Sequence, residues 1–326
     1  MRIMRFAEII GNSALKESLV KTVEAGRLGH AILISEGECG GGFAFATALA
    51  QYVNCSNPSG GDSCGVCPSC NKIGKMIHPD VHFIFPTTAP STSLSLLASW
   101  RDLVLANPAF TESELNEALG IEGKSAIISV AEARSVLSTL SLSALEGGWK
   151  AVVIYLPEKM NQEAANRLLK VIEEPPRLTQ FVLITHSPEK ILQTIASRCQ
   201  RIRVMPCSGL RKTRVEFPEF DTLMDALVRK DLSAALEASD ALAALPSRES
   251  AKSFCVFAGE RLRDIFLAQQ GLSAADERTG RLASSLKKTF PRTALQAFDR
   301  ARMLIERNVN LKILFTDLAN RLYMIL

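Results

Sequence analysis

Four cysteines in a short stretch of the chain have the spacing of a metal site. A tetrahedral zinc ion takes four thiolates, and two-residue gaps let one turn present neighbouring sulfurs to the same ion. With all four positions filled by protein, such a zinc would be structural rather than catalytic. The alternative is a set of unligated core cysteines, as we expect for the four scattered ones among the eight in the chain. The clustered residues are Cys55, Cys64, Cys67 and Cys70.

A second candidate site is a glycine-rich turn between an apolar strand and a helix of small residues. Residues 37–44 are G-E-C-G-G-G-F-A. A nucleotide-binding P-loop is G-x-x-x-x-G-K-[ST], whose Lys reaches the phosphates and whose hydroxyl binds Mg²⁺. Gly37 and Gly42 match, but Phe43 replaces the Lys and Ala44 replaces the hydroxyl residue. We therefore expect a degenerate P-loop without bound nucleotide; the alternative is a glycine-rich turn unrelated to nucleotides.

The acid that would complete a hydrolytic site is missing as well. P-loop ATPases carry an Asp, often followed by Glu, at the end of a second buried strand, to hold Mg²⁺ and orient water. The candidate strand, residues 151–154, is followed by Y-L-P-E-K. Its only acid, Glu158, stands beside Lys159, and we expect a solvated pair or a helix start there. Loss of the Lys, the hydroxyl and the acid together argues against hydrolysis by this chain.

An alternation of strands and helices in residues 1–205 must position these groups. Such alternation indicates an α/β fold with a doubly wound parallel sheet. A zinc module, residues 55–78, and a Ser-, Thr- and Pro-rich insertion, residues 86–123, interrupt it. Apolar runs predict strands at 31–35, 81–85, 151–156 and 181–185, and helical patterns lie at 44–53, 130–141 and 162–173.

Beyond residue 205 the pattern is helical throughout. The last predicted helix is apolar over a broad face, which suits either a bundle core or a core together with an oligomer interface. We expect one or two helices over 221–245 and further helices at 250–270, 275–289 and 291–326.

Composition limits the class of protein only mildly. The chain has 326 residues, 47% of them hydrophobic, and a net charge of +4 with a pI near 8.6. This balance permits nucleic acid or an acidic partner but requires neither. The sequence has no signal-peptide pattern and no apolar stretch of membrane-spanning kind, so we expect a cytoplasmic protein without a membrane partner.

Several longer motifs resemble one protein family. Residues 164–176, A-A-N-R-L-L-K-V-I-E-E-P-P, nearly match a run typical of bacterial DNA polymerase III clamp-loader subunits, the AAA+ proteins of the gamma/tau and delta-prime kind. The four cysteines are similar to the zinc module of that family. Ser197-Arg198-Cys199 is similar to its S-R-C motif, although Arg198 taken alone would be an ordinary surface charge. The resemblance covers most of residues 1–205 and the helical part more loosely.

The departures from that family favour one kind of subunit. Motor subunits have an intact P-loop and an Asp-Glu-Ala-Asp tetrad, which here is Y-L-P-E at residues 155–158. Losing the nucleotide groups while keeping S-R-C resembles the delta-prime pattern. The resemblance implies an AAA+ domain over 1–205, a short helical lid or linker over 206–245 and a helical collar domain over 246–326.

The same resemblance implies a function. The chain would be a non-hydrolysing stator of the replicative clamp loader, with no ATPase activity of its own, inside the DNA polymerase III holoenzyme. Arg198, with Ser197 and Cys199, would be a trans arginine finger for ATP bound by a neighbouring subunit, and the metal would be structural Zn²⁺. The partners would be gamma/tau motor subunits and a delta subunit in a five-membered ring, the beta sliding clamp, and primed DNA through the complex.

Two other functions remain open from the sequence. A divergent gamma/tau-like motor subunit that hydrolyses ATP would need substitutes for the missing Lys, hydroxyl and acid. A zinc-dependent nucleic-acid-binding module would need positive charge near the cysteines. The nearby cations are Lys72 and Lys75, and the ligand loop, residues 56–69, holds none.

Overall fold

The computed structural model describes residues 5–9, 11–37, 40–205, 217–272 and 276–326. The chain forms two compact units, Met1–Thr213 and Arg214–Leu326. Of the predicted lid or linker, residues 206–245, residues 206–216 lie outside the described part. Among the described helices, none is long and apolar enough to cross a membrane.

The N-terminal unit is built on a five-stranded parallel sheet, which confirms the predicted α/β class. Its strand order is β2-β3-β4-β1-β5, and every neighbouring pair is parallel. All four predicted strands are present within two residues of their predicted ends, and a fifth follows the S-R-C motif. The strands are β1 (Ala31–Ser35), β2 (Val81–Ile84), β3 (Lys150–Tyr155), β4 (Thr179–Thr185) and β5 (Gln200–Arg203).

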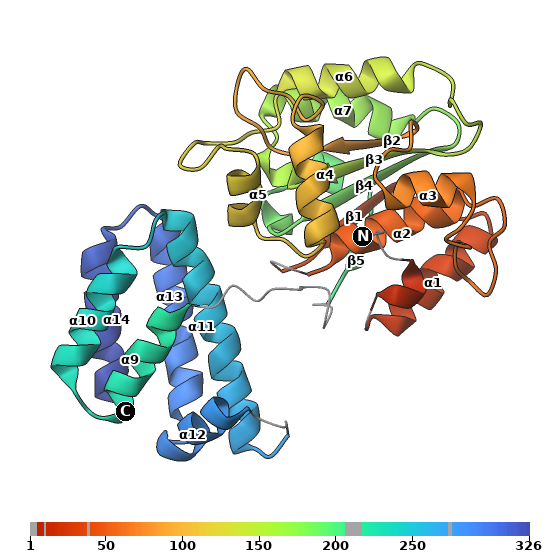
Figure 1. The fold of residues 1–326 in the computed structure, drawn as a ribbon. Coiled ribbons are helices and arrows are strands. Elements are labelled where there is room, and N and C mark those ends of the chain that lie inside the picture. Colours follow the sequence, from red (N-terminus) through yellow and green to blue (C-terminus); the bar gives the residue numbers. More distant parts are fainter. Residues whose placement is uncertain (1–4, 10, 38–39, 206–216, 273–275) are drawn as a thin grey trace. The chain divides into compact units, whose positions relative to one another are not determined.

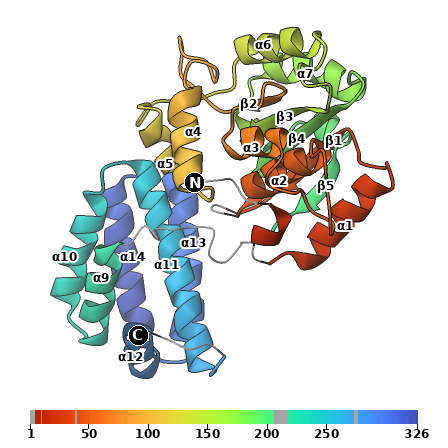
Figure 2. The same cartoon turned by 45° about the vertical axis from the view of Figure 1, so that its right-hand side comes forward.

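Helices cover both faces of this sheet (Figures 1 and 2). Successive residues of a strand point to opposite faces, so Ile32 and Ile34 join one core while Ala31 and Leu33 join the other. The first face carries η1 (Phe6–Glu8), α1 (Ser13–Glu24), α2 (Gly42–Val53), α3 (Pro68–Gly74), α4 (Leu97–Ala106) and α5 (Glu112–Ala118). The second face carries α6 (Val130–Leu140), α7 (Gln162–Glu173) and α8 (Gln193–Ala196), and the 3₁₀ turns are η2 (Pro157–Lys159) and η3 (Pro188–Lys190).

Helix α2 follows the glycine-rich turn, and helix α7 carries Glu173 at its end. Every residue of α2 from Gly42 to Tyr52 is buried, because alternating alanines let this helix lie close against the sheet. Helix α7 begins at a cap in which Asn161 Oδ1 accepts a hydrogen bond from the backbone N–H of Ala164 at 2.8 Å. It ends just before the Pro175-Pro176 pair, which disfavours helix in the preceding residue.

The C-terminal unit is entirely helical over its described residues, as predicted. Helices α9 and α10 share one core with the later helices, and the expected division between a lid and a collar at residue 245 stays a prediction. Figure 2 shows α11 and α13 side by side in this unit. The helices are α9 (Pro218–Val228), α10 (Leu232–Ala243), α11 (Arg248–Gln269), α12 (Glu277–Ser285), α13 (Phe290–Glu306) and α14 (Leu311–Ile325).

The single helix expected over residues 291–326 is wrong, because the chain breaks there into α13 and α14. Asn308 adopts a left-handed conformation with φ of 60°, which ends a right-handed helix. Asn310 then starts the next helix by accepting hydrogen bonds from the N–H groups of Lys312, at 2.9 Å, and Ile313, at 3.3 Å. Asn308 and Asn310 could have indicated a break between helices, but the apolar periodicity of the sequence continues across them and predicts one helix.

Candidate functional site

The glycine-rich turn connects strand β1 to helix α2, the layout expected from the sequence. Helix α2 begins at Gly42, after Gly41 in the left-handed conformation with φ of 92°. Residues 38 and 39 lie outside the described part of the turn. Phe43 and Ala44, at the positions of the P-loop Lys and Ser/Thr, are 2% and 0% exposed. Neither residue therefore offers a charge or a hydroxyl to a phosphate at this turn.

Phe43 belongs to an aromatic cluster instead. Its ring centroid lies 5.8 Å from that of Phe83 on β2 and 5.5 Å from that of Trp100 on α4. Phe110, just before α5, lies 6.3 Å away. Centroid separations of this size are those of favourable edge-on and tilted aromatic pairs. The insertion 86–123, to which the sequence assigned no chemistry, thus packs directly against the residue that replaces the P-loop Lys.

Glu158 lies in the first turn of η2, so the helix start that was one of its two expected roles is present. Its carboxylate accepts hydrogen bonds from Thr185 Oγ1 at 2.8 Å and from the backbone N–H of His186 at 3.0 Å. Lys159 forms its ion pair with Glu112. The expected Glu158–Lys159 pair is therefore wrong, because parallel pairing of β3 and β4 brings the turn after β3 beside the end of β4. Glu158 joins two strand ends.

Sequence reasoning missed another acid at this edge. The Glu36 side chain follows β1, is 4% exposed and accepts a hydrogen bond from the Gly42 N–H. The signal was present, since Glu36 is a charged residue between an apolar strand and a run of glycines. The contact with Gly42 itself depends on the folded structure and does not follow from the spacing of the residues.

Arg198 lies on the surface directly after α8. Its side chain is 38% exposed, and its Nη1 donates hydrogen bonds to Thr194 O at 2.8 Å and Ser197 Oγ at 3.4 Å. Its Nη2 lies 2.5 Å from Glu173 Oε1 at the end of α7, an ion pair that the sequence did not suggest. Cys199 turns inward, and burial raises the pKa of its thiol to about 11. Of the S-R-C motif, Arg198 alone presents a long charged group to solvent.

The structure does not join Arg198 to the glycine-rich turn. Within the described residues, the hydrogen bonds and ion pair of its side chain are all with α7, α8 and the residue after α8. The two predicted features are thus separate groups on the same unit.

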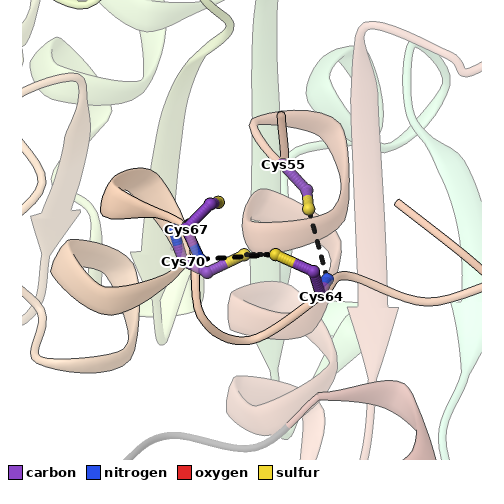
Figure 3. A group of neighbouring side chains, drawn as sticks. All are labelled: Cys55, Cys64, Cys67 and Cys70. Carbon is purple, nitrogen blue, oxygen red and sulfur yellow. Dashed lines mark hydrogen bonds between the residues drawn. The ribbon is translucent and has the colours of Figure 1, made fainter. Parts of the chain in front are cut away.

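The four clustered cysteines lie together, as predicted (Figure 3). Their Sγ atoms are all within 4.8 Å of one another, and those of Cys64 and Cys70 are 4.0 Å apart. Tetrahedral coordination with metal–sulfur distances of about 2.3 Å separates the sulfurs by about 3.8 Å. Cys55 follows α2, Cys67 caps α3, and Cys70 lies within α3. This donor set and its spacing fit a single metal ion.

Backbone N–H groups point at these sulfurs and favour the thiolate form that binds metal. The N–H of Cys64 donates to Cys55 Sγ at 3.2 Å, that of Cys67 to Cys64 Sγ at 3.3 Å, and that of Cys70 to Cys67 Sγ at 3.5 Å. Hydrogen bonds from Val66 and Cys67 lower the pKa of Cys64. Burial raises the pKa of Cys55 and of Cys70. For Cys67, burial acts upward, but hydrogen bonds from Cys70 and Ser56 bring the pKa down to about 6.

Polar contacts fasten the cysteine loop to the rest of the unit. The side chain of Gln51 on α2 donates to Cys70 O at 2.9 Å and accepts from Ser63 Oγ at 2.9 Å. Asp62 accepts hydrogen bonds from the N–H groups of Phe6, at 3.2 Å, and Ala7, at 2.8 Å. The loop therefore joins the first turn of the chain to the end of α2.

Comparison with known proteins gives a consistent family match. The model of the family described as DNA polymerase III, delta subunit, matches residues 11–208. DNA polymerase III subunit delta' of Escherichia coli (strain K12) is 32% identical over 184 residues, covering 56% of this chain and 45% of that protein. The delta' subunit of Bacillus subtilis (strain 168) is 28% identical over 215 residues, covering 66% of this chain and 50% of that protein.

A related subunit of another name is also similar. DNA polymerase III subunit tau of Escherichia coli (strain K12) is 26% identical over 200 residues, which are 61% of this chain and 25% of that protein. The chain spans about half the length, or less, of the curated relatives it matches.

Proposed function

The chain belongs to the family described as DNA polymerase III, delta subunit, and we propose that it is the non-hydrolysing stator of a clamp loader. In this role it binds no ATP for turnover and completes the ATP site of a neighbouring gamma/tau motor subunit. The proposal extends the likeness to delta' subunits from sequence to mechanism.

One observation carries the proposal: buried Phe43 and Ala44 stand where a P-loop ATPase has its Lys and its hydroxyl, while Arg198 is exposed. Phe43 and Ala44 are buried in the core, and Glu158 is bonded to the end of β4. A P-loop enzyme needs a Lys, a hydroxyl for Mg²⁺ and an acid to orient water. In this chain Phe43 and Ala44 pack in the core, and Glu158 connects the turn after β3 to the end of β4.

Arg198 has the chemistry for a contribution in trans. A guanidinium is permanently charged and presents a planar fork that binds phosphate oxygens in pairs. Arginine fingers supplied to a neighbouring site accelerate phosphoryl transfer by about 10³–10⁵. The ion pair with Glu173 holds the Arg198 side chain at the surface after α8. There the guanidinium can leave Glu173 and bind a phosphate on a partner subunit. Exposed ion pairs are weak, about 0–1 kcal/mol, so this exchange costs little.

The cysteine cluster supports a structural zinc ion. Four thiolates and no open position are typical of zinc sites that hold a fold together. Residues Cys55, Cys64, Cys67 and Cys70 would hold the ion, which would fasten α3 to the end of α2. Bound there, zinc supplies cross-linking and no reaction step.

The proposed assembly follows the family. The partners are gamma/tau motor subunits and a delta subunit in a five-membered ring, with the beta sliding clamp as cargo and primed DNA as its destination. Residues 1–205 form the AAA+ domain, 206–245 a lid or linker, and 246–326 the contribution to a helical collar.

The first test is ATP turnover by the purified chain and by the loader assembled with it. We expect no turnover above background for the chain alone and normal turnover for the assembled loader. Robust Mg²⁺-dependent hydrolysis by the chain alone would support the divergent motor alternative and overturn the proposal.

A further inference from the structure

Glu36 places a buried carboxylate where the N-terminal end of helix α2 begins. Its side chain is 4% exposed, although it lies in a turn. Its Oε2 accepts a hydrogen bond from the backbone N–H of Gly42, the first residue of α2, at 2.5 Å. The backbone of Glu36 is fixed as well, since its own N–H donates to Thr185 O of β4 at 3.0 Å. Hydrogen bonds of both its side chain and its backbone therefore fix the position of Glu36.

The glycines of the turn leave the space that this side chain fills. A methyl group on Gly40 would lie 2.6 Å from Cβ of Glu36, and one on Gly42 would lie 3.0 Å from its carboxylate carbon. Both distances are shorter than carbon atoms tolerate without displacement. In nucleotide-binding loops, glycines let the backbone approach a phosphate closely. Here the group that approaches the backbone is the carboxylate of the same chain.

The electrostatic surroundings favour a negative charge at this point. The start of a helix carries unpaired N–H groups and a partial positive charge, and both attract anions. On the other side, Nε2 of His186 lies 3.6 Å from Glu36 Oε1. Glu158, another acid at these strand ends, accepts hydrogen bonds from Thr185 and from the backbone of His186. The carboxylate of Glu36 is therefore the anion at the N-terminal start of α2.

We infer that Glu36 is an internal substitute for a phosphate, occupying the anion position at the start of α2 and excluding phosphate ligands from it. This goes beyond the proposed function, on which it rests only in taking the turn as a former nucleotide loop. Loss of the P-loop Lys removes an attraction, whereas Glu36 adds a repulsion. A carboxylate and a phosphate that share one position repel each other, because both are negatively charged. The anion site is thus closed by an occupant.

The test is binding of inorganic pyrophosphate, without metal, to the full chain and to three variants. Glu36→Ala empties the position, Glu36→Gln keeps the shape and removes the charge, and Glu189→Gln changes an exposed acid on η3 as the control. We expect the native chain and the control to bind no pyrophosphate at about 1 mM. Removing the repulsion should improve the dissociation constant of both Glu36 variants by at least about tenfold.

Hydrogen exchange of the Gly42 amide gives a second measurement that does not depend on affinity. The amide should be protected in the native chain without added anion, and in Glu36→Ala only when pyrophosphate is present. Equal pyrophosphate affinity of the native chain and both Glu36 variants, including no binding by any of them, would overturn the inference. If Glu36→Ala does not fold, the comparison of Glu36→Gln with Glu189→Gln decides. None of these outcomes depends on Arg198 or on assembly of a loader, which test the proposed function.

Discussion

Phe43 illustrates how one residue changes the chemistry of a whole turn. In a working P-loop this position carries the Lys that reaches the phosphates. Here the side chain points into the core and contacts the rings of Phe83, Trp100 and Phe110. Burial of one Phe side chain stabilises a fold by about 1.5–3 kcal/mol, so the replacement is part of the stability of the unit. Restoring the Lys cannot simply restore the function.

We predict that Phe43→Lys destabilises the chain by about 3–5 kcal/mol and does not create ATP binding, since the Lys would be buried among aromatic rings. The matched control is Phe266→Lys on α11, where the ring is already 38% exposed. Surface changes of that kind cost less than about 1 kcal/mol. Denaturant unfolding and titration with ATP measure both effects. A stable Phe43→Lys chain that binds ATP would show that the Lys position still faces a nucleotide site.

At the scale of elements, the buried strands were the most predictable features of the fold. Strand β1 occupies the predicted residues 31–35, because strands covered by helices on both faces are continuously apolar. The grouping of the four clustered cysteines was equally predictable, since they are close together in the sequence. Helices α1 and α3 were not predicted, because α1 has a mixed polar surface and α3 has only seven residues.

The contacts of Glu36, Glu158 and Arg198 could not be predicted from spacing. Each joins residues that are distant in the sequence or lie across a turn, and each depends on which strands and helices are neighbours. Glu158 reaches Thr185 only because β3 pairs with β4. Arg198 reaches Glu173 only because α8 packs against α7. The sequence named Glu158 and Arg198 as candidates but not Glu36, and the topology decides the partners of all three.

The cysteine loop leads to a prediction on metal removal. We expect one zinc ion per chain, and we expect chelation to lower the unfolding temperature and to increase hydrogen exchange in residues 55–78 while leaving β1 protected. Cys67→Ser should lose the metal, since a Cys₄ site depends on each thiolate. Cys255→Ser is the control, because that thiol is buried in α11, where burial raises its pKa to about 12. Equal metal content in the two variants, by elemental analysis, would refute a zinc site at these cysteines.

At the scale of the whole molecule, the two units have separate cores. The helical unit centres on Phe254, whose ring lies 5.5 Å from Phe217, 5.9 Å from Phe298 and 6.0 Å from Phe315. The sheet unit has one core on each face of its sheet. Two separate cores allow one unit to serve assembly while the other carries Arg198.

We predict that Phe254→Ala destabilises the helical unit alone, by about 3–5 kcal/mol, because it opens a cavity in a fully packed core. Hydrogen exchange should rise in α11, α13 and α14, which contribute Phe254, Phe298 and Phe315, and stay unchanged in β1 to β4. Met303→Ala, at a side chain that is 53% exposed on α13, is the control. Equal loosening of both units by Phe254→Ala would show that they fold as a single cooperative body.

The role proposed for Arg198 is to complete the ATP site of a neighbouring subunit. Its most direct test is the clamp- and DNA-stimulated ATPase of a reconstituted loader that contains the native chain, Arg198→Ala or Arg167→Ala. Arg167 is the matched control, an Arg 41% exposed that pairs with Glu163 on α7. With normal assembly in all three, we predict that Arg198→Ala lowers turnover by about one site's share and that Arg167→Ala changes nothing. Unchanged turnover with Arg198→Ala in a correctly assembled ring would contradict the account and leave Arg198 as a surface charge.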